Sequence, residues 1–215
     1  MSDKNLDGSK GGEWLAVNSG MQFFLRNPGP CIRLSDIATG LSNQCRYSGQ
    51  LDTFYSVAQH SVFVMEHVWR DLPKDLDETE RRFLLLQALL HDASEAYIVD
   101  IPTPFKKMPE MAAYRAVEAE VQDACFRHFG LDIFPGDLHP LVKHYDALAA
   151  VYERRHLMEQ WEGSPILWGS FDEVSEDGSV VLRKEFRDVL YMGPPKPLSP
   201  KKARAAFLDA FQQVF

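Results

Sequence analysis

Cysteine is scarce in this sequence: its 215 residues include three, Cys31, Cys45 and Cys125. The three are widely and irregularly spaced, and no Cys-x-x-Cys pair occurs. An odd number of cysteines without paired spacing argues against a disulfide framework and against a cysteine-rich zinc site. We therefore expect a protein of the reducing cytoplasm.

Long apolar runs and an excess of basic charge are also absent. The longest apolar stretches, Phe83–Leu86 and Ala88–Leu90, are far too short to span a bilayer, and no signal peptide opens the chain. The 23 basic and 31 acidic residues give a net charge of −8, which disfavours a broad surface for duplex nucleic acid. We expect neither a membrane nor duplex nucleic acid as a partner. Hydrophobic residues make up 45% and charged residues 25%, as in a globular protein.

The hydrophobic pattern is that of helices. Val57, His60, Val64 and Val68 recur at helical spacing and predict a helix over 56–71. Further helices are predicted over 81–97, 110–129 and 137–160, a last one begins at Ser199-Pro200, a short one is expected near 35–41, and one strand is expected at 179–182. The predicted fold class is all-α, a helical bundle.

Four segments follow from this pattern. Residues 1–13 are polar and glycine-rich and are predicted to be a disordered leader. Residues 14–160 form the predicted core domain. Residues 161–198 form an irregular insertion rich in Gly, Pro and acidic residues, and residues 199–215 form a C-terminal helix that packs on the core.

Imidazoles and carboxylates are the main candidates for chemistry, because glycine-rich phosphate loops, G-x-S-x-G elbows and H-E-x-x-H motifs are absent. His60 lies on the inward stripe of one helix, His91 and Asp92 are adjacent on the central helix, and Asp146 is on the inward face of a later helix. Buried carboxylates are paired or bind metal, because an unpaired one costs several kcal/mol. Two imidazoles and two carboxylates from three helices would bind one divalent cation. Mixed nitrogen and oxygen ligands suit Mn, Co, Fe, Ni or Zn, with Mg as a further candidate.

The His-Asp pair alone is a weak signal, because seven His and 17 Asp residues give about half such a dipeptide by chance. The flanking residues add the specificity. The run from His91 to Lys106, HDASEAYIVDIPTPFK, resembles the signature of bacterial HD-domain 5′-deoxynucleotidases. AQHSV at 58–62 and LVKHYDAL at 141–148 resemble that family's first-histidine and final-aspartate helices. SNQCRY at 42–47, leading to FYSV at 54–57, resembles a subgroup of phage and bacterial HD hydrolases.

The resemblance covers roughly residues 46–155 and implies an HD-domain helical bundle with one divalent metal ion. The implied metal ligands are His60, His91, Asp92 and Asp146. A water on this metal would attack phosphorus, and Glu95 would orient or deprotonate that water. The alternative for Glu95 is a helix-face partner of His91 at i,i+4.

The resemblance also suggests residues that contact the substrate. Asp100 matches a second family carboxylate near the leaving group or sugar, and its alternative is an ordinary turn residue. Lys106 and Lys143 match lysines that neutralise phosphates, and their alternative is a solvated surface position. Arg46 matches the arginine of a family Arg-Trp pair that shapes sugar and phosphate selection, although Tyr47 stands in place of the tryptophan. The alternative for Arg46 is a structural salt bridge.

Three functions remain open at this point. The first is hydrolysis of deoxynucleoside 5′-monophosphates to nucleoside and phosphate. The second is a triphosphohydrolase that releases tripolyphosphate from deoxynucleoside triphosphates, and the third is a nucleotide-binding HD protein without catalysis. We expect a small-molecule nucleotide as the partner and a homo-oligomer as the assembly.

Overall fold

A computed structural model describes residues 13–131, 137–158, 171–175 and 180–215. Over these ranges the protein is mostly helical, which confirms the predicted fold class. The eight α-helices of this part of the chain are α1 (Leu34–Asn43), α2 (Val57–Arg70), α3 (Glu78–Leu90), α4 (Glu95–Ile98), α5 (Thr103–Lys106), α6 (Ala112–His128), α7 (Pro140–Leu157) and α8 (Pro200–Val214). The predicted leader falls almost wholly outside the described residues, and the division into four segments stays a prediction.

Two short antiparallel hairpins accompany the helices. Strands β1 (Trp14–Ala16) and β2 (Gln22–Phe24) pair near the N-terminus, and β3 (Asp172–Val174) pairs with β4 (Val180–Leu182). The second hairpin confirms the predicted strand. The first was not predicted, since its strands are only three residues long. Four 3₁₀ segments complete the described structure: η1 (Gly29–Cys31), η2 (Arg46–Gly49), η3 (Pro109–Met111) and η4 (Lys184–Tyr191).

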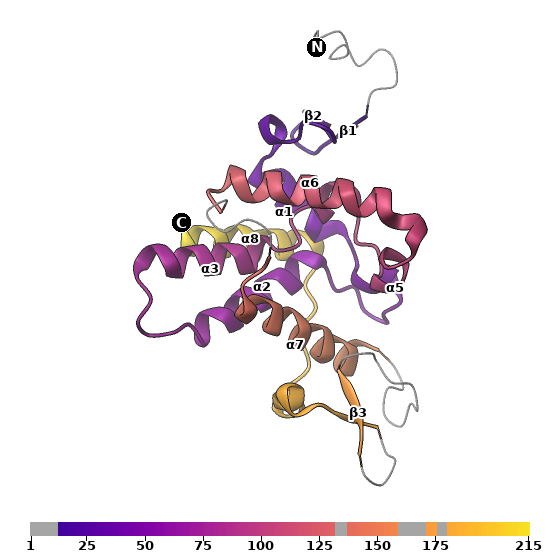
Figure 1. Ribbon diagram of the computed structural model, residues 1–215, viewed down its shortest axis with the longest axis vertical. Coiled ribbons are helices and arrows are strands. Elements are labelled where there is room, and N and C mark those ends of the chain that lie inside the picture. The colour runs from indigo at the N-terminus through magenta and orange to yellow at the C-terminus, as the bar shows by residue number, and fades with distance from the viewer. Residues whose placement is uncertain (1–12, 132–136, 159–170, 176–179) are drawn as a thin grey trace.

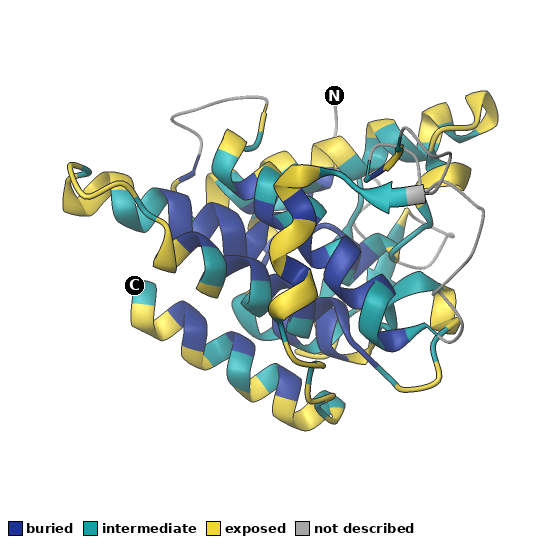
Figure 2. Cartoon of the chain, turned by 90° about the horizontal axis from the view of Figure 1, so that it is seen from below, coloured by how far each residue is buried: buried dark blue, intermediate teal, exposed yellow. Residues whose placement is uncertain are grey.

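The two hairpins lie at opposite ends of the long axis of the molecule (Figure 1). Between them, α2 contacts α3, α7 and α8, while α1 contacts α4 and α8. The C-terminal helix therefore packs on the core helices, although more than a hundred residues separate it from α1 and α2. Burial is concentrated where these helices meet, and α8 is buried along one face and exposed along the other (Figure 2).

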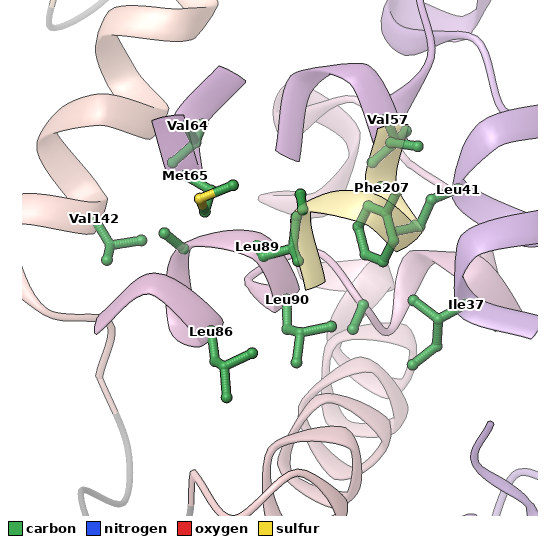
Figure 3. Close-up of a cluster of buried hydrophobic side chains, with 14 of the residues drawn as sticks. Ile37, Leu41, Val57, Val64, Met65, Leu86, Leu89, Leu90, Val142 and Phe207 are labelled. Carbon is green, nitrogen blue, oxygen red and sulfur yellow. The ribbon is translucent and has the colours of Figure 1, made fainter. Parts of the chain in front are cut away.

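The core is a cluster of aliphatic side chains with a few aromatic rings. Figure 3 shows Ile37 and Leu41 of α1, Leu89 of α3 and Phe207 of α8 in this cluster, and all four are fully buried. The predicted inward stripe of α2 is confirmed, because each of its four members, His60 included, is 0% exposed. An imidazole therefore lies in an otherwise apolar row.

Local signals fix several helix ends. The Ser56 hydroxyl accepts a hydrogen bond from the Gln59 amide at 3.2 Å and caps α2. Asp77 and Glu80 form a capping box at the start of α3. Gly130 has φ of 74° and follows α6, as predicted from its position.

The predicted helix over 81–97 is wrong in its second half. Helix α3 ends at Leu90, residues 91–94 form a turn, and α4 begins at Glu95. In the turn, the amides of Ala93 and Glu95 bond carbonyls three residues back instead of four. The His91 ring also donates a hydrogen bond from Nδ1 to the carbonyl of Ala88, at 2.7 Å. The sequence does not reveal this break, because no glycine or proline interrupts the helical pattern, although His91, Asp92 and Ser94 are weaker helix formers.

A close helix contact places α4. A Cβ added to Gly40 of α1 would lie 2.5 Å from the carbonyl oxygen of Ala96, so only glycine allows this approach. Just beyond α1, the Gln44 amide donates to the Glu95 carbonyl at 2.6 Å and accepts from the Asp100 amide at 2.8 Å. The Gln44 side chain therefore holds both ends of the segment from Glu95 to Asp100 against the C-terminal end of α1.

Candidate metal centre

The structure brings together the four side chains predicted as metal ligands. His60 is on α2, His91 and Asp92 follow α3, and Asp146 is on α7. The Nε2 atoms of the two histidines are 3.2 Å apart. Asp146 Oδ1 lies 3.2 Å from His60 Nε2 and 3.7 Å from His91 Nε2, and Asp92 Oδ2 lies at 3.7 and 3.2 Å from the same two atoms. Three helices separated in sequence thus place four ligand groups around one point.

The outer nitrogens of the two imidazoles decide which atoms face that point. His91 Nδ1 lies 2.7 Å from the Ala88 carbonyl, and His60 Nδ1 lies 2.7 Å from Glu153 Oε1. Both partners only accept, so each Nδ1 carries the proton. In the neutral tautomers, both Nε2 lone pairs therefore point toward each other and toward two carboxylates.

Four acceptor groups around one point require a cation. Burial opposes a charge on His91, but the carboxylates of Asp92 and Asp146 outweigh it and raise the pKa of His91 well above its usual value. Burial likewise opposes ionisation of Asp146, yet hydrogen bonds with His60 and His91 hold its pKa well below the ordinary range. A divalent metal ion satisfies the same demand as a proton, and the ligand atoms of His60, His91 and Asp146 all lie within 4.8 Å of one another. These residues therefore fit a metal ion by the chemistry of their donors.

Exposure divides the centre into two halves. The side chains of His60 and His91 are 0% and 2% exposed, whereas those of Asp92 and Asp146 are 22% and 43% exposed. The histidines are held in the core, and the carboxylates face solvent. A small ligand would reach the cation from the carboxylate half.

Glu95 lies at the start of α4 and is 5% exposed. Its Oε1 is 3.3 Å from Lys106 Nζ, and its Oε2 has no hydrogen-bond partner among the described residues. Burial, then the charges of Asp92 and Asp100, raise the pKa of Glu95 well above its usual value, against the opposing effect of Lys106. A higher pKa makes a carboxylate a stronger base. Among the described contacts, neither oxygen of Glu95 pairs with His91, which was the alternative for this residue.

Asp100 follows α4 through Val99, whose φ of 77° is unusual for a β-branched residue. The bonds from Val99 N to the Glu95 carbonyl and from the Tyr114 hydroxyl to the Val99 carbonyl hold this conformation. Burial raises the pKa of Asp100, and the nearby charge of Arg46 opposes the shift. Asp100 therefore follows a constrained backbone, of a kind common at functional sites, and its charge interacts with those of Arg46 and Asp92.

Arg46 lies beside the centre, with Nη1 3.8 Å from Asp92 Oδ2. Its Nε donates to Glu153 Oε2 at 2.7 Å, and the Tyr47 hydroxyl donates to the same oxygen at 2.9 Å. Tyr47 adopts the left-handed conformation, with φ of 56°, which costs about 1–2 kcal/mol for a residue with a side chain. The structure thus contains the salt bridge proposed as the alternative for Arg46, and places it against a predicted metal ligand.

The two lysines predicted to contact phosphate differ. Lys106 Nζ contacts Glu95 at 3.3 Å and Glu118 at 2.6 Å, so its ammonium group lies beside the proposed base. Lys143 is half exposed and pairs with Asp137 at 3.3 Å. Within the described residues, no ion pair links Lys143 to the four ligands.

Two curated relatives share most of the chain. The uncharacterized protein YfdR of Escherichia coli is 30% identical over 184 residues, which cover 85% of this chain and 84% of YfdR. The chain belongs to the YfdR family. A second relative, the uncharacterized protein RCAP_rcc00048 of Rhodobacter capsulatus, is 34% identical over 148 residues, or 67% of this chain and 72% of that protein. No family model matches the chain.

The alignment with YfdR is longer than residues 46–155, the range that carries most of the sequence motifs. It spans 184 residues, against 110 in that range. The family likeness therefore includes parts of the hairpins or of α8 as well as the centre. No helix in the described part of this YfdR-family chain has the length and apolar character needed to cross a membrane.

Sequence reasoning missed Glu153, which is 0% exposed and bonds both His60 and Arg46. Its position gives a signal that was available: it follows Asp146 by seven residues on the same helix, which places both on one face. Gln44 and Glu118 were also missed. Their roles depend on contacts across 51 and 12 residues, which no local pattern predicts.

Proposed function

We propose that this YfdR-family chain is a metal-dependent phosphohydrolase of the HD superfamily that converts deoxynucleoside 5′-monophosphates to nucleoside and phosphate. The observation that carries the proposal is the convergence of His60, His91, Asp92 and Asp146, in the order H…HD…D, with both Nε2 atoms turned inward. The motifs around these residues resemble those of the HD-domain 5′-deoxynucleotidases.

The donor set supports a single divalent ion held by the two imidazoles and the two carboxylates. Nitrogen and oxygen ligands together favour Mn, Co, Fe, Ni or Zn, and Mg remains a candidate. When bound, such an ion acts as a Lewis acid on a phosphoryl oxygen and lowers the pKa of water. The residues of the chain would transfer the protons and hold the phosphate.

Glu95 is suited to act as the general base. Its Oε2 has no hydrogen-bond partner among the described residues, and Lys106 holds the other oxygen. Water adds to phosphorus as its proton passes to Glu95, and the bond from phosphorus to the 5′ oxygen breaks. The leaving oxygen then takes up a proton to give the nucleoside. Asp100, whose charge acts on Glu95, is suited to contact the sugar or to supply that proton.

Arg46 and Lys106 are suited to hold the phosphate. Both are cations at the edge of the centre, one 3.8 Å from Asp92 and the other 3.3 Å from Glu95. A phosphate that approaches from the exposed carboxylate half would meet both. A cation beside anionic ligands also limits the repulsion between those ligands and the incoming phosphate.

A triphosphohydrolase is the second candidate, and the positions of the basic groups bear on it. A triphosphate needs more positive charge than a monophosphate. Among the described residues, Arg46 and Lys106 are already paired with carboxylates, and Lys143 pairs with Asp137. This distribution favours the smaller anion. A protein that binds nucleotides without hydrolysing them is the third candidate, and we propose a homo-oligomer for each.

A release assay tests the proposal. The protein is incubated with deoxynucleoside mono- and triphosphates in the presence of Mn²⁺, Co²⁺, Mg²⁺ or Zn²⁺, and phosphate and tripolyphosphate are measured. We expect phosphate from monophosphates, and the His60→Ala variant should lose it. Tripolyphosphate from a triphosphate would favour the second candidate, and nucleotide binding without turnover would favour the third.

His67→Ala provides the matched control for His60→Ala. His67 lies on α2 two turns from His60, and its ring bonds the Phe63 carbonyl at 2.8 Å outside the centre. Loss of a histidine from the same helix should therefore leave turnover within about twofold. Equal loss of activity in the two variants would contradict a special role for His60.

A further inference from the structure

We propose that Glu153 is a positioning residue that orients the metal ligand His60 with one carboxylate oxygen and the phosphate-facing Arg46 with the other. This inference rests on the proposed metal centre and adds a residue that lies behind it. It predicts that one buried carboxylate couples the binding of the metal ion to the binding of the phosphate.

Glu153 divides its two oxygens between two halves of the centre. Oε1 accepts from His60 Nδ1 at 2.7 Å. Oε2 accepts from Arg46 Nε at 2.7 Å and from the Tyr47 hydroxyl at 2.9 Å. Glu153 itself is 0% exposed, so water does not compete for these bonds.

The bond to His60 sets the tautomer that a metal ligand needs. With its proton fixed on Nδ1, His60 presents an unprotonated Nε2 to the ion. A carboxylate behind a ligating histidine also increases the basicity of the ligand and fixes the plane of the ring. The corresponding bond of His91 goes to the neutral carbonyl of Ala88, so of the two Nδ1 atoms only that of His60 has a charged partner.

The bond to Arg46 sets the direction of the guanidinium group. Because Nε is held by Glu153, the group is turned so that Nη1 lies 3.8 Å from Asp92, at the edge of the centre. The same oxygen anchors Tyr47, which is adjacent to Arg46 in η2 and adopts a left-handed backbone. Glu153 therefore holds the whole η2 segment against α7.

A simpler role would be charge balance, in which Glu153 only neutralises a buried arginine. That role predicts a loss of stability without a specific loss of metal affinity. The next residue of α7 offers a matched control. Arg154 forms an ion pair with Asp172 at 3.0 Å, and both are buried, but neither contacts the centre in the described contacts.

The test is a calorimetric titration of Mn²⁺ into the metal-free full chain. Glu153→Gln preserves the shape of the side chain but removes its charge, and its amide can turn a donor toward His60 Nδ1. We expect Mn²⁺ to bind 10- to 100-fold more weakly to this variant. Asp172→Asn should lower the melting temperature while its Mn²⁺ affinity stays within about twofold of wild type.

A titration of inorganic phosphate, with and without Mn²⁺, measures how strongly the binding of the metal ion and of the phosphate are coupled. In the wild type, Mn²⁺ should increase phosphate affinity, and Glu153→Gln should reduce this increase by at least about fivefold, the lower end of typical coupling between sites. Unchanged Mn²⁺ affinity in a folded Glu153→Gln protein overturns the inference. Equal loss of Mn²⁺ affinity in Asp172→Asn also overturns it, because a general loss of stability would then suffice.

The wild type separates this inference from the function on which it rests. If the unmodified chain binds no Mn²⁺ in a 1:1 ratio, the proposed metal centre itself fails. Should no Glu153 variant fold, the tautomer of His60 can be read from two-bond proton–nitrogen NMR couplings in the wild type loaded with diamagnetic Zn²⁺. A proton on Nδ1 supports the inference, and a proton on Nε2 overturns it.

Discussion

Two buried charged groups are adjacent on α7 and have different surroundings. Glu153 lies behind the half-open centre, where it bonds His60 and the η2 residues Arg46 and Tyr47. Arg154 forms a two-pronged ion pair with Asp172 of β3, at 3.0 and 3.1 Å, and both side chains are at most 2% exposed. Burial of a charge therefore does not mark function by itself. The difference is that the partners of Glu153 have further ligand atoms that face an open site.

Loss of a carboxylate from the open half should have the largest effect. Asp146 is 43% exposed, so Asp146→Ala should leave the fold intact while it removes a metal ligand. We expect no 1:1 binding of Mn²⁺ and a fall in activity of at least about 10³-fold, because a metal ion contributes several kcal/mol to the transition state. Calorimetry and phosphate release check both results. Normal turnover in this variant would contradict the metal centre.

Loss of the Arg154–Asp172 pair should act on stability instead. Asp172→Ala removes the carboxylate that Arg154 bonds at 3.0 and 3.1 Å, and breaking such a buried pair costs about 3–5 kcal/mol. Denaturant unfolding should show this loss, and Mn²⁺ should still bind. A variant that kept its stability but lost Mn²⁺ would reverse the comparison between the two residues of α7.

Replacement of the proposed base should separate chemistry from metal binding. Glu95→Gln removes the proton acceptor but no metal ligand, so kcat should fall by about 10²- to 10⁴-fold while the affinity for Mn²⁺ stays close to that of wild type. Steady-state kinetics and calorimetry on the same sample check this. Loss of the metal together with the rate would show that Glu95 is a ligand.

The contact between α1 and α4 offers a smaller test. The methyl group of Gly40→Ala would meet the Ala96 carbonyl at 2.5 Å, so we expect about 1–3 kcal/mol of lost stability. Activity should also fall, because α4 begins with Glu95. Gly29→Ala is the matched control, since a Cβ there meets nothing within 4 Å. Equal unfolding curves for the two variants would contradict the tight contact.

The pH dependence of the metal-free protein should show the smallest effect. The carboxylates raise the pKa of His91 well above 6.5, so protonated His91 stabilises the fold fully below about pH 6.5 and this contribution is lost as the pH rises through the raised pKa. The melting temperature should therefore fall above pH 6.5. Saturating Mn²⁺ should remove the fall, since the ion replaces the proton. A melting temperature that rises over this interval would contradict the assignment.

The sequence was sufficient for the parts of the fold that depend on local pattern. The stripe of α2, the end of α6 just before Gly130 and the start of α8 at Pro200 follow from spacing and capping residues. The four ligands follow from their polar character on apolar faces, together with the flanking motifs. The structure shows that these four side chains converge.

Other features depend on tertiary contacts and could not be predicted. The break after Leu90 depends on a turn in which His91 bonds the carbonyl of Ala88. The first hairpin has strands too short for a clear alternating pattern. The spacing from Asp146 places Glu153 on the inward face of α7, but its bond to Arg46, 107 residues earlier, does not follow from that spacing.

Helix α8 has a consequence for how the protein is made. The Gln59 side chain, next to His60, donates to the Lys196 carbonyl and accepts from the Leu198 amide just ahead of α8, and Phe207 fills the core between α1 and α3. A ribosome that has synthesised Asp146 has made all four ligands, but must add more than fifty residues before α8 begins at Pro200. The nascent chain therefore carries the four proposed ligands before it has the helix that covers the adjoining core. A cation that bound at this stage would bind a centre whose supporting helices do not yet pack against α8.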